Sequence, residues 1–482
     1  MGGETTRIAI IGAGFAGLGM AVRLRQKGIH DFVVLERADD LGGTWRDNSY
    51  PGCAVDVQSH LYSYSFAPNP DWTQVYSPQP EIWEYIRRTA EEHGVLPHVR
   101  FRHEVERADW DDDAQRWTIH TPGGTVTAQF LVSGMGPLSN PIPPDIPGVE
   151  DFAGPCFHSA RWEHEHDLRG KRVGVIGTGS SAAQFVPEIQ PAVGRLVVFQ
   201  RTPGWVIPRF NRRLSSFEHQ LYRRFPLVQR LARFRQYAYR ESIAFGWLRE
   251  GRSRWMQTAL KARIRQQIAD PELRAKVTPD YSPGCKRMVV SDDFLPALAQ
   301  PNVDLVTTGV ERILPGGVRL ADGTEHELDV LILGTGFEVM PVADPLRGRD
   351  GTALAERWSE RRSAYLGTAV AGYPNYFMLG GPNTATGHTS VLLYTEPQIE
   401  YVIQAIQTLD AQGKGSAEVR PEVQDAFNAE LRERLKKTVW VSGGCSSWYL
   451  DKDGSSSALW PGYTWEFRKR LREFDTSDFV LA

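Results

Sequence analysis

The sequence has few cysteines and no long hydrophobic run. Its four cysteines, Cys53, Cys156, Cys285 and Cys445, lie far apart and form no Cys-x-x-Cys pair. This spacing argues against a redox dithiol and against a zinc site, so we expect four reduced thiols and no metal ligand set. No stretch of about 18 consecutive apolar residues occurs, and a membrane-spanning helix is therefore not expected.

The chain also lacks a strong excess of charge of either sign. It has 55 Lys and Arg residues against 58 Asp and Glu residues, a formal net charge of -3. A nearly neutral chain gives no global electrostatic reason to bind nucleic acid. The first residues enter a strand-like run without the apolar core and cleavage site of a signal peptide, which favours a cytoplasmic protein. A length of 482 residues predicts two or three domains.

A glycine turn stands at the start of the chain. The apolar run of residues 7–11 is followed by Gly12, Gly14 and Gly17 and then by a helical pattern, which is the strand, tight turn and helix of a dinucleotide site. Glu36 ends the next apolar run 19 residues after Gly17, the spacing expected for a carboxylate that binds a ribose hydroxyl. The expected cofactor contacts are Gly12, Gly14, Phe15, Ala16, Gly17, Glu36 and Arg37.

A loop rich in turn-forming residues follows this first site, from Gly42 to Asp56. It is too irregular for a helix or strand, and we expect it to lie over the nucleotide. Asp56 is bracketed by small and apolar residues, so partial burial beside a cation is one interpretation, and a solvated loop aspartate is the other.

A second glycine turn follows the strand expected at residues 171–176. It consists of Gly177, Thr178, Gly179, Ser180 and Ser181, with Ala182 as the third small residue. Arg201 lies 19 residues after Ala182, where the first site has a carboxylate. A guanidinium can bind a 2′-phosphate and a carboxylate would repel it, so the second site should prefer NADPH, while the first accepts an unphosphorylated adenosine such as that of FAD.

These features predict an α/β protein with two Rossmann-like dinucleotide-binding domains. The expected division is an FAD-binding part in residues 1–145, an NADP-binding domain in 146–330 with a helical insertion at about 205–280, and a second FAD-binding part with a C-terminal cover in 331–482. The insertion is rich in arginine. We expect it to be a lid packed on its own domain with its arginines in water; the alternative is a basic amphipathic helix on a membrane surface.

The linker between the two sites carries a family resemblance. The pattern Phe152-x-Gly154-x-x-x-His158-x-x-x-Trp162 resembles the signature of type I Baeyer-Villiger monooxygenases, with Glu163 where that family more often has Pro or Asp. A second signature resembles Gly43-x-Trp45, Tyr50-Pro51-Gly52 and Asp56. With both glycine turns and the pairs Arg201-Thr202 and Lys286-Arg287, the similarity covers nearly the whole chain.

The resemblance implies FAD, NADPH, molecular oxygen and a ketone substrate, with an ester or lactone formed through a C4a-peroxyflavin. It implies that Arg287 stabilises the charge that develops during oxygenation and that Asp56 holds Arg287. Further cofactor contacts expected on the same ground are Gly43, Thr44, Trp45, Arg201, Thr202, Lys286 and Trp448. For His158 a structural role in the linker is favoured over acid–base chemistry.

Alternatives remain at this point. A flavin enzyme that oxygenates nitrogen or sulfur would share most of these motifs, and sulfide oxidation is expected as a second activity. An NADPH oxidase or reductase that makes no oxygenated product, or a dinucleotide sensor without activity, would share the two glycine turns. A monomer or a homodimer is expected.

Overall fold

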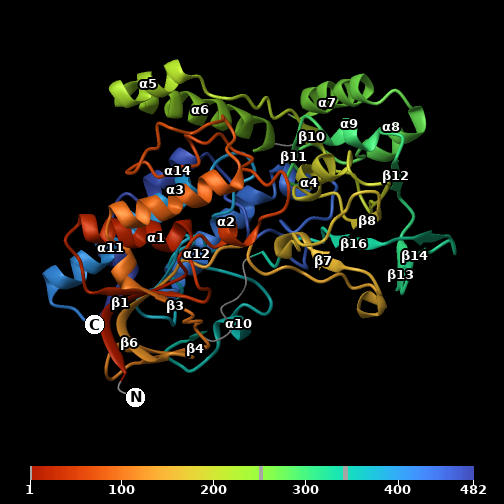
Figure 1. Cartoon of the computed structure of the whole chain (residues 1–482). Coiled ribbons are helices and arrows are strands. Elements are labelled where there is room, and N and C mark those ends of the chain that lie inside the picture. Colours follow the sequence, from red (N-terminus) through yellow and green to blue (C-terminus); the bar gives the residue numbers. More distant parts are fainter. Residues whose placement is uncertain (1–2, 249–252, 340–345) are drawn as a thin grey trace.

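Two sheets that contain parallel strands organise the protein (Figure 1). The computed structural model describes residues 3–248, 253–339 and 346–482. The first sheet is formed by the N-terminal third of the chain and by two short strands of the last third. The second is formed by residues between these parts. The α/β class expected from the sequence is therefore confirmed.

The first sheet places the first glycine turn at its centre. Its strands are, in spatial order, β17 (Leu346–Arg347), β4 (Arg107–Asp111), β5 (Arg116–Thr121), β6 (Gly124–Ser133), β1 (Glu4–Ile11), β2 (Phe32–Glu36) and β3 (Val99–Phe101), with β18 (Tyr376–Met378) also beside β6. Strand β1 is parallel to both β2 and β6, and Ile11 pairs with Leu35 and Ser133. The turn thus follows the carboxyl end of a central parallel strand, where α/β sheets bind ligands.

The second sheet repeats this arrangement. Its described strands are all parallel, in the order β12 (Val303–Val306), β9 (Arg195–Phe199), β8 (Arg172–Ile176), β16 (Val330–Leu333) and β7 (Cys156–His158). Ile176 at the end of β8 pairs with Phe199 and Leu333. The second glycine turn therefore leaves a central strand in the same way as the first.

Helices cover both sheets and add one outlying group (Figure 1). The long helix α11 packs beside α1, and its buried face includes Ile399, Val402 and Ile406. Helices α5 and α6 lie apart from the sheets, over the loop that follows the first site. The α-helices are α1 (Phe15–Gln26), α2 (Thr44–Asp47), α3 (Gln79–Glu92), α4 (Ala182–Ile189), α5 (Ser216–Arg224), α6 (Pro226–Trp247), α7 (Arg254–Gln267), α8 (Pro271–Val277), α9 (Phe294–Leu298), α10 (Leu354–Arg357), α11 (Leu392–Gln412), α12 (Pro421–Leu435), α13 (Val439–Ser442) and α14 (Thr464–Arg470).

Short elements complete the fold. The small sheets are β10 (Val206–Ile207) with β11 (Val289–Val290), β13 (Val310–Leu314) with β14 (Gly317–Leu320) and β15 (Glu325–Glu327), and β19 (Ala417–Val419) with β20 (Phe479–Leu481). Short 3-10 helices are η1 (Leu96–His98), η2 (Val149–Asp151), η3 (Ser159–Arg161) and η4 (Thr476–Asp478). In the described part of the chain, no helix is both long enough and apolar enough to cross a membrane.

The expectation of four reduced thiols is wrong for one pair. Cys285 and Cys445 form a disulfide across 160 residues of sequence, while Cys53 and Cys156 are free. The C-terminal segment folds back onto the loop before Lys286, and a Cβ placed on Gly443 would lie 2.7 Å from the Cβ of Cys285. Spacing along the chain could not predict this pair because the contact is made only by the tertiary fold.

Candidate active site

The first glycine turn is shaped by close backbone contacts. Gly12 has φ +91°, and its N–H donates to the carbonyl of Leu35 over 2.8 Å. A Cβ on Gly17 would lie 1.9 Å from the carbonyl oxygen of Gly12, so only glycine lets α1 pack this closely on the turn. Gly43 comes from the next loop to lie against Gly14, since a Cβ placed on Gly43 would lie 3.4 Å from the Cα of Gly14. Thr44 and the buried Trp45 follow in α2.

Glu36 lies at the end of β2, where the ribose-binding carboxylate is expected. Its side chain is buried and accepts hydrogen bonds from the N–H groups of Ala13 at 2.8 Å and Ala38 at 3.0 Å. Arg46 contacts the same carboxylate at 3.2 Å. These bonds fix the carboxylate against the glycine turn. The neighbouring Arg37 instead donates to the side chain of Asn140 at 3.0 Å.

The second turn has the same backbone pattern with a more open tip. Gly177 has φ +107°, and its N–H donates to the carbonyl of Phe199 over 3.0 Å. A Cβ placed on Gly179 would have no protein atom within 4 Å, so there is room beside the turn for a ligand. Thr178, Ser180 and Ser181 complete the turn before α4 begins at Ala182.

The two basic side chains expected to bind the 2′-phosphate lie close to each other. Arg201 is exposed and follows β9, and Lys286 comes from the loop that also carries Arg287. Burial and the charge of Arg201 lower the pKa of Lys286, so the two positive charges are close enough to repel each other. The ammonium of Lys286 also lies 5.1 Å from the ring centre of Tyr281. Within the described residues neither cation forms a salt bridge, and a phosphate group would relieve their repulsion.

Asp56 and Arg287 meet although 231 residues separate them. The Arg287 Nη2 and Nε atoms lie 2.5 and 3.2 Å from Oδ2 of Asp56, and Nη1 donates to the carbonyl of Thr386 at 3.3 Å. Burial alone would raise the pKa of Asp56, but the charge of Arg287 and its hydrogen bond outweigh burial and lower it. The charge of Asp56 raises the pKa of Arg287 against the effect of burial. Both groups are therefore held in their charged forms.

Helix α4, which follows the second glycine turn, contacts the loop before Asp56. Its Gln184 donates to the carbonyl of Ala54 at 2.9 Å and accepts from the hydroxyl of Tyr50 at 3.0 Å. A Cβ on Gly52, which has φ +76°, would lie 2.7 Å from the carbonyl oxygen of Gln184. The Tyr50-Pro51-Gly52 signature therefore has a packing reason, since it lets the loop before Asp56 touch α4.

The linker packs on the same helix. The Trp162 ring lies 5.3 Å from that of Phe185 in α4, and a Cβ on Gly154 would lie 2.4 Å from the carbonyl oxygen of Asp329. The Nδ1 atom of His158 accepts the N–H of Ala160 at 3.1 Å and caps η3. Burial lowers the pKa of this buried histidine. His158 is thus part of the linker's own structure and belongs to a different segment from the Asp56–Arg287 pair.

Two further residues around the ion pair were missed from the sequence. Arg240 of α6 donates to the carbonyl of Asp56 at 3.2 Å and to the side chain of Gln58 at 2.9 Å. Tyr449 lies beside Arg287, and burial is the main cause that raises the pKa of its hydroxyl to about 12. Arg240 shares a helix face with Gln229 and Arg233, and this spacing of polar residues could have indicated that the face is buried. Nothing in the sequence singles out Tyr449.

The tail reaches the site through the disulfide. Cys445 is bonded to Cys285, next to Lys286, and the segment then continues to Trp448 and Tyr449. The Trp448 side chain is 46% exposed, with its ring 4.4 Å from that of Tyr449. The tail therefore reaches Arg287 through Tyr449.

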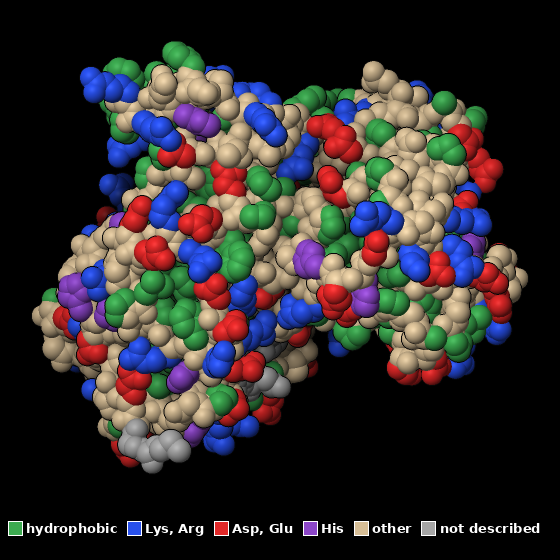
Figure 2. Space-filling model, viewed as in Figure 1, with side chains coloured by type: hydrophobic (Ala, Val, Ile, Leu, Met, Phe, Trp, Pro, Cys, Tyr) green, Lys and Arg blue, Asp and Glu red, His purple; other side chains and the backbone are tan. Residues whose placement is uncertain are grey.

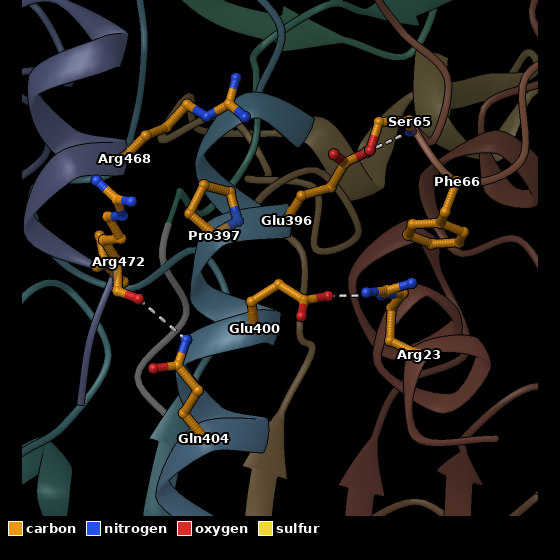
Figure 3. Close-up of a pocket in the computed structure, with 10 residues that line it drawn as sticks. Arg23, Ser65, Phe66, Glu396, Pro397, Glu400, Gln404, Arg468 and Arg472 are labelled. Carbon is orange, nitrogen blue, oxygen red and sulfur yellow. Dashed lines mark hydrogen bonds and ion pairs between the residues drawn. The ribbon is translucent and has the colours of Figure 1, made fainter. Parts of the chain in front are cut away.

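A surface pocket of about 390 Å³ lies elsewhere, between α1, α11 and α14 (Figure 3). Two of its charged side chains, Arg23 and Glu400, contact each other at 2.5 Å, and Glu396 accepts the N–H of Ser65 at 2.7 Å. It contains none of the residues expected to bind a cofactor or to act in catalysis. We do not assign the reaction to this pocket.

Comparison with known proteins agrees with this geometry. Residues 5–342 match the family described as flavin-binding monooxygenase-like. A Baeyer-Villiger monooxygenase of Streptomyces coelicolor is 48% identical over 99% of this chain and 93% of its own length, and one of Pseudomonas aeruginosa is 46% identical over 99% and 91%. The structure of OTEMO in complex with FAD and NADP has a TM-score of 0.91 at 28% identity, with both chains covered fully. Cyclohexanone monooxygenase from Rhodococcus sp. Phi1 bound to NADP+ has a TM-score of 0.89 at 27% identity, over 100% of this chain and 99% of that one.

Proposed function

The chain belongs to the Baeyer-Villiger monooxygenases of the flavin-binding monooxygenase-like family, and from this membership we propose that it converts ketones to esters or lactones. It depends on FAD and NADP. Molecular oxygen is the co-substrate. The contact between Asp56 and Arg287 is the observation that supports the proposal, since it holds a charged guanidinium against the loop that follows the first glycine turn.

The residues present fit both cofactors. The approach of Gly43 to Gly14 leaves bare backbone for the FAD pyrophosphate, with Glu36 beside its ribose. The open space at Gly179 suits the NADP pyrophosphate, and Arg201, Thr202 and Lys286 suit its 2′-phosphate. When bound, NADPH and FAD would supply the chemistry of hydride transfer and oxygen activation.

Arg287 is the proposed catalytic cation. Its guanidinium is held on one side by Asp56 and on another by the carbonyl of Thr386, so it need not reorganise as charge develops. It would stabilise the negative charge that develops on the carbonyl oxygen of the reacting ketone. Asp56 keeps Arg287 in place and charged, and Tyr449 narrows the space around it.

The division into domains is also a proposal. We assign residues 1–145 and 331–482 to an FAD-binding domain and 146–330 to an NADP-binding domain with its helical insertion, with the return crossover directly after β16. Arg287 and Lys286 would then belong to one domain and Asp56 to the other. The linker of residues 152–162 would then let the NADP domain turn between hydride transfer and oxygenation.

The test is the origin of the product oxygen. Purified enzyme with NADPH and oxygen-18 gas is given cyclic, linear and aryl ketones, and products are scored by mass. One labelled oxygen in an ester or lactone is the expected result. The same panel includes aryl sulfides, because we propose sulfoxidation as a second activity. Labelled sulfoxide without any ester would favour the alternative oxygenase, and stoichiometric hydrogen peroxide with every substrate would refute both.

A further inference from the structure

Helix α6 presents its polar face to the protein. Gln229 is buried and donates to the carbonyl of Asn69 at 2.6 Å, and Arg233 donates to the carbonyls of His60 and Ser63 at 2.5 and 2.8 Å. Arg240 is buried on Gln58 and the Asp56 carbonyl. The expectation that the arginines of this insertion lie in water is therefore wrong for Arg233 and Arg240. Their guanidinium groups donate charge-assisted hydrogen bonds to backbone carbonyls of residues 56–63.

The opposite face of α6 is apolar and exposed. Leu227, Leu231, Phe234 and Ala238 follow the i, i+4, i+7, i+11 spacing of one helical stripe. The first three are 75%, 57% and 61% exposed. A surface helix of a soluble protein normally turns such a stripe toward the core, so this helix is inverted.

Two aromatic side chains near the start of α6 extend the stripe. Phe217 of α5 is 71% exposed and Phe225 between the helices is 53% exposed. Figure 2 shows green side chains grouped with blue ones on the projecting part of the molecule that α5 and α6 form in Figure 1. A contiguous exposed apolar patch of this kind marks a binding surface. We name this surface the α5–α6 face and define it by Phe217, Phe225, Leu227, Leu231 and Phe234.

The charge around the α5–α6 face is basic. Residues 216–247 contain six arginines against two glutamates, although the whole chain has a formal net charge of -3. Arg224, Arg230 and Arg235 are exposed and have no acidic partner in the described chain. Arg230 and Arg235 fall on the two sides of the stripe, because each residue advances the helix by about 100°. Long arginine side chains can then reach past the apolar stripe to anionic groups.

We propose that the α5–α6 face binds the surface of an anionic phospholipid membrane. An exposed apolar stripe with arginines on both flanks is the pattern by which a helix lies in the membrane interface. Acyl chains would cover the stripe, and lipid phosphates would pair with the arginines. A second copy of the chain fits less well, because two-fold pairing of this face would bring its basic flanks together. The opposite side of α6 lies on the loop that carries Asp56, so docking sets the active site beside the bilayer.

Vesicle binding tests the proposal. Full-length enzyme is sedimented with phosphatidylcholine vesicles that do or do not contain phosphatidylglycerol. We expect binding only with phosphatidylglycerol, weakened by salt. The pair Leu231→Ser and Phe234→Ser should lower the partition coefficient roughly tenfold or more. The pair Arg230→Gln and Arg235→Gln should lower it about fivefold for each arginine.

Matched variants on other faces serve as controls. Leu96→Ser with Val480→Ser removes two exposed apolar side chains, and Lys414→Gln with Lys469→Gln removes two exposed charges; both pairs should bind vesicles like the wild type. Turnover of a water-soluble substrate and thermal stability should stay unchanged in all variants. The proposal is overturned if the wild type does not bind, or if the α5–α6 variants bind equally well. If the wild type does not bind vesicles but forms a dimer that Leu231→Ser with Phe234→Ser abolishes, the α5–α6 face binds a second copy of the chain instead. Vesicle binding is read without ketone turnover, so either result stands whatever the substrate proves to be.

Discussion

The Asp56–Arg287 ion pair joins residues that neither glycine turn contains. Replacement of Arg287 by Ala should leave NADPH-dependent flavin reduction near the wild-type rate, because the hydride passes between the cofactors. Oxygenation of a ketone should fall by about 10²- to 10³-fold, the loss expected when a preorganised charge is removed. Anaerobic stopped-flow reduction and product mass measure the two steps separately.

A control for that substitution is Arg195→Ala. Arg195 is exposed and paired with Asp304 on the second sheet, and its loss should change neither step. Ester formation by the Arg287→Ala variant at the wild-type rate would show that the assigned role is wrong.

Asp56 gives the ion pair a dependence on pH. Its pKa is lowered in the folded protein from the ordinary value of 3.8, with Arg287 outweighing burial. The stability it contributes is therefore fully present above pH 3.8 and is lost as pH falls through the lowered value. Asp56→Asn should cost about 1 to 3 kcal/mol at neutral pH, less than a fully buried pair because both side chains are partly exposed.

Thermal unfolding of wild type and Asp56→Asn over acid to neutral pH checks this sign. The difference between their midpoints should be greatest at neutral pH and shrink toward the acid end. A difference that does not vary with pH would mean that the carboxylate charge is not what the variant loses.

The disulfide connects the tail to the loop that carries Lys286 and Arg287. Because the bond closes a loop of 160 residues, its removal should cost about 2 to 5 kcal/mol. Cys285→Ser and Cys445→Ser should each lower the thermal midpoint, and Cys156→Ser, which removes a free thiol, should not. Thiol titration of the unfolded, unreduced protein should find two groups, and four after reduction. Four thiols before reduction in freshly oxidised protein would contradict the assignment.

Some elements could be predicted from sequence because their signals are local. The two glycine turns, Glu36 and Arg201 follow from a strand, a turn and a fixed spacing. The orientation of α6 could not be predicted, since its polar face is buried against acceptors of a distant segment, among them the His60 and Ser63 carbonyls that Arg233 contacts. Asp56 and Arg287 were connected by family resemblance alone. Their contact depends on α4, through Gln184, and this contact has no sequence signature.

Arg201 and Lys286 lie on segments that are 85 residues apart in the sequence. The tertiary fold brings these two cations close to each other. A bound 2′-phosphate would relieve their repulsion, so NADP+ should stabilise the protein more than NAD+ does. At 100 times its dissociation constant a ligand adds about 2.7 kcal/mol to the free energy of unfolding. The double variant Arg201→Ala and Lys286→Ala should lose about 1.5 to 3 kcal/mol of the binding free energy of NADP+ for each phosphate contact removed.

Thermal shifts with NADP+ and NAD+, together with the Michaelis constants for NADPH and NADH, measure this preference. The double variant should shift equally with both nucleotides and raise the Michaelis constant for NADPH more than that for NADH. A control pair, Arg195→Ala with Lys276→Ala, removes two cations that already have acidic partners and should keep the preference. If the double variant still prefers NADP+ as the wild type does, the phosphate is bound by other residues. The charge inversion between Glu36 and Arg201 would then not explain which nucleotide each site accepts.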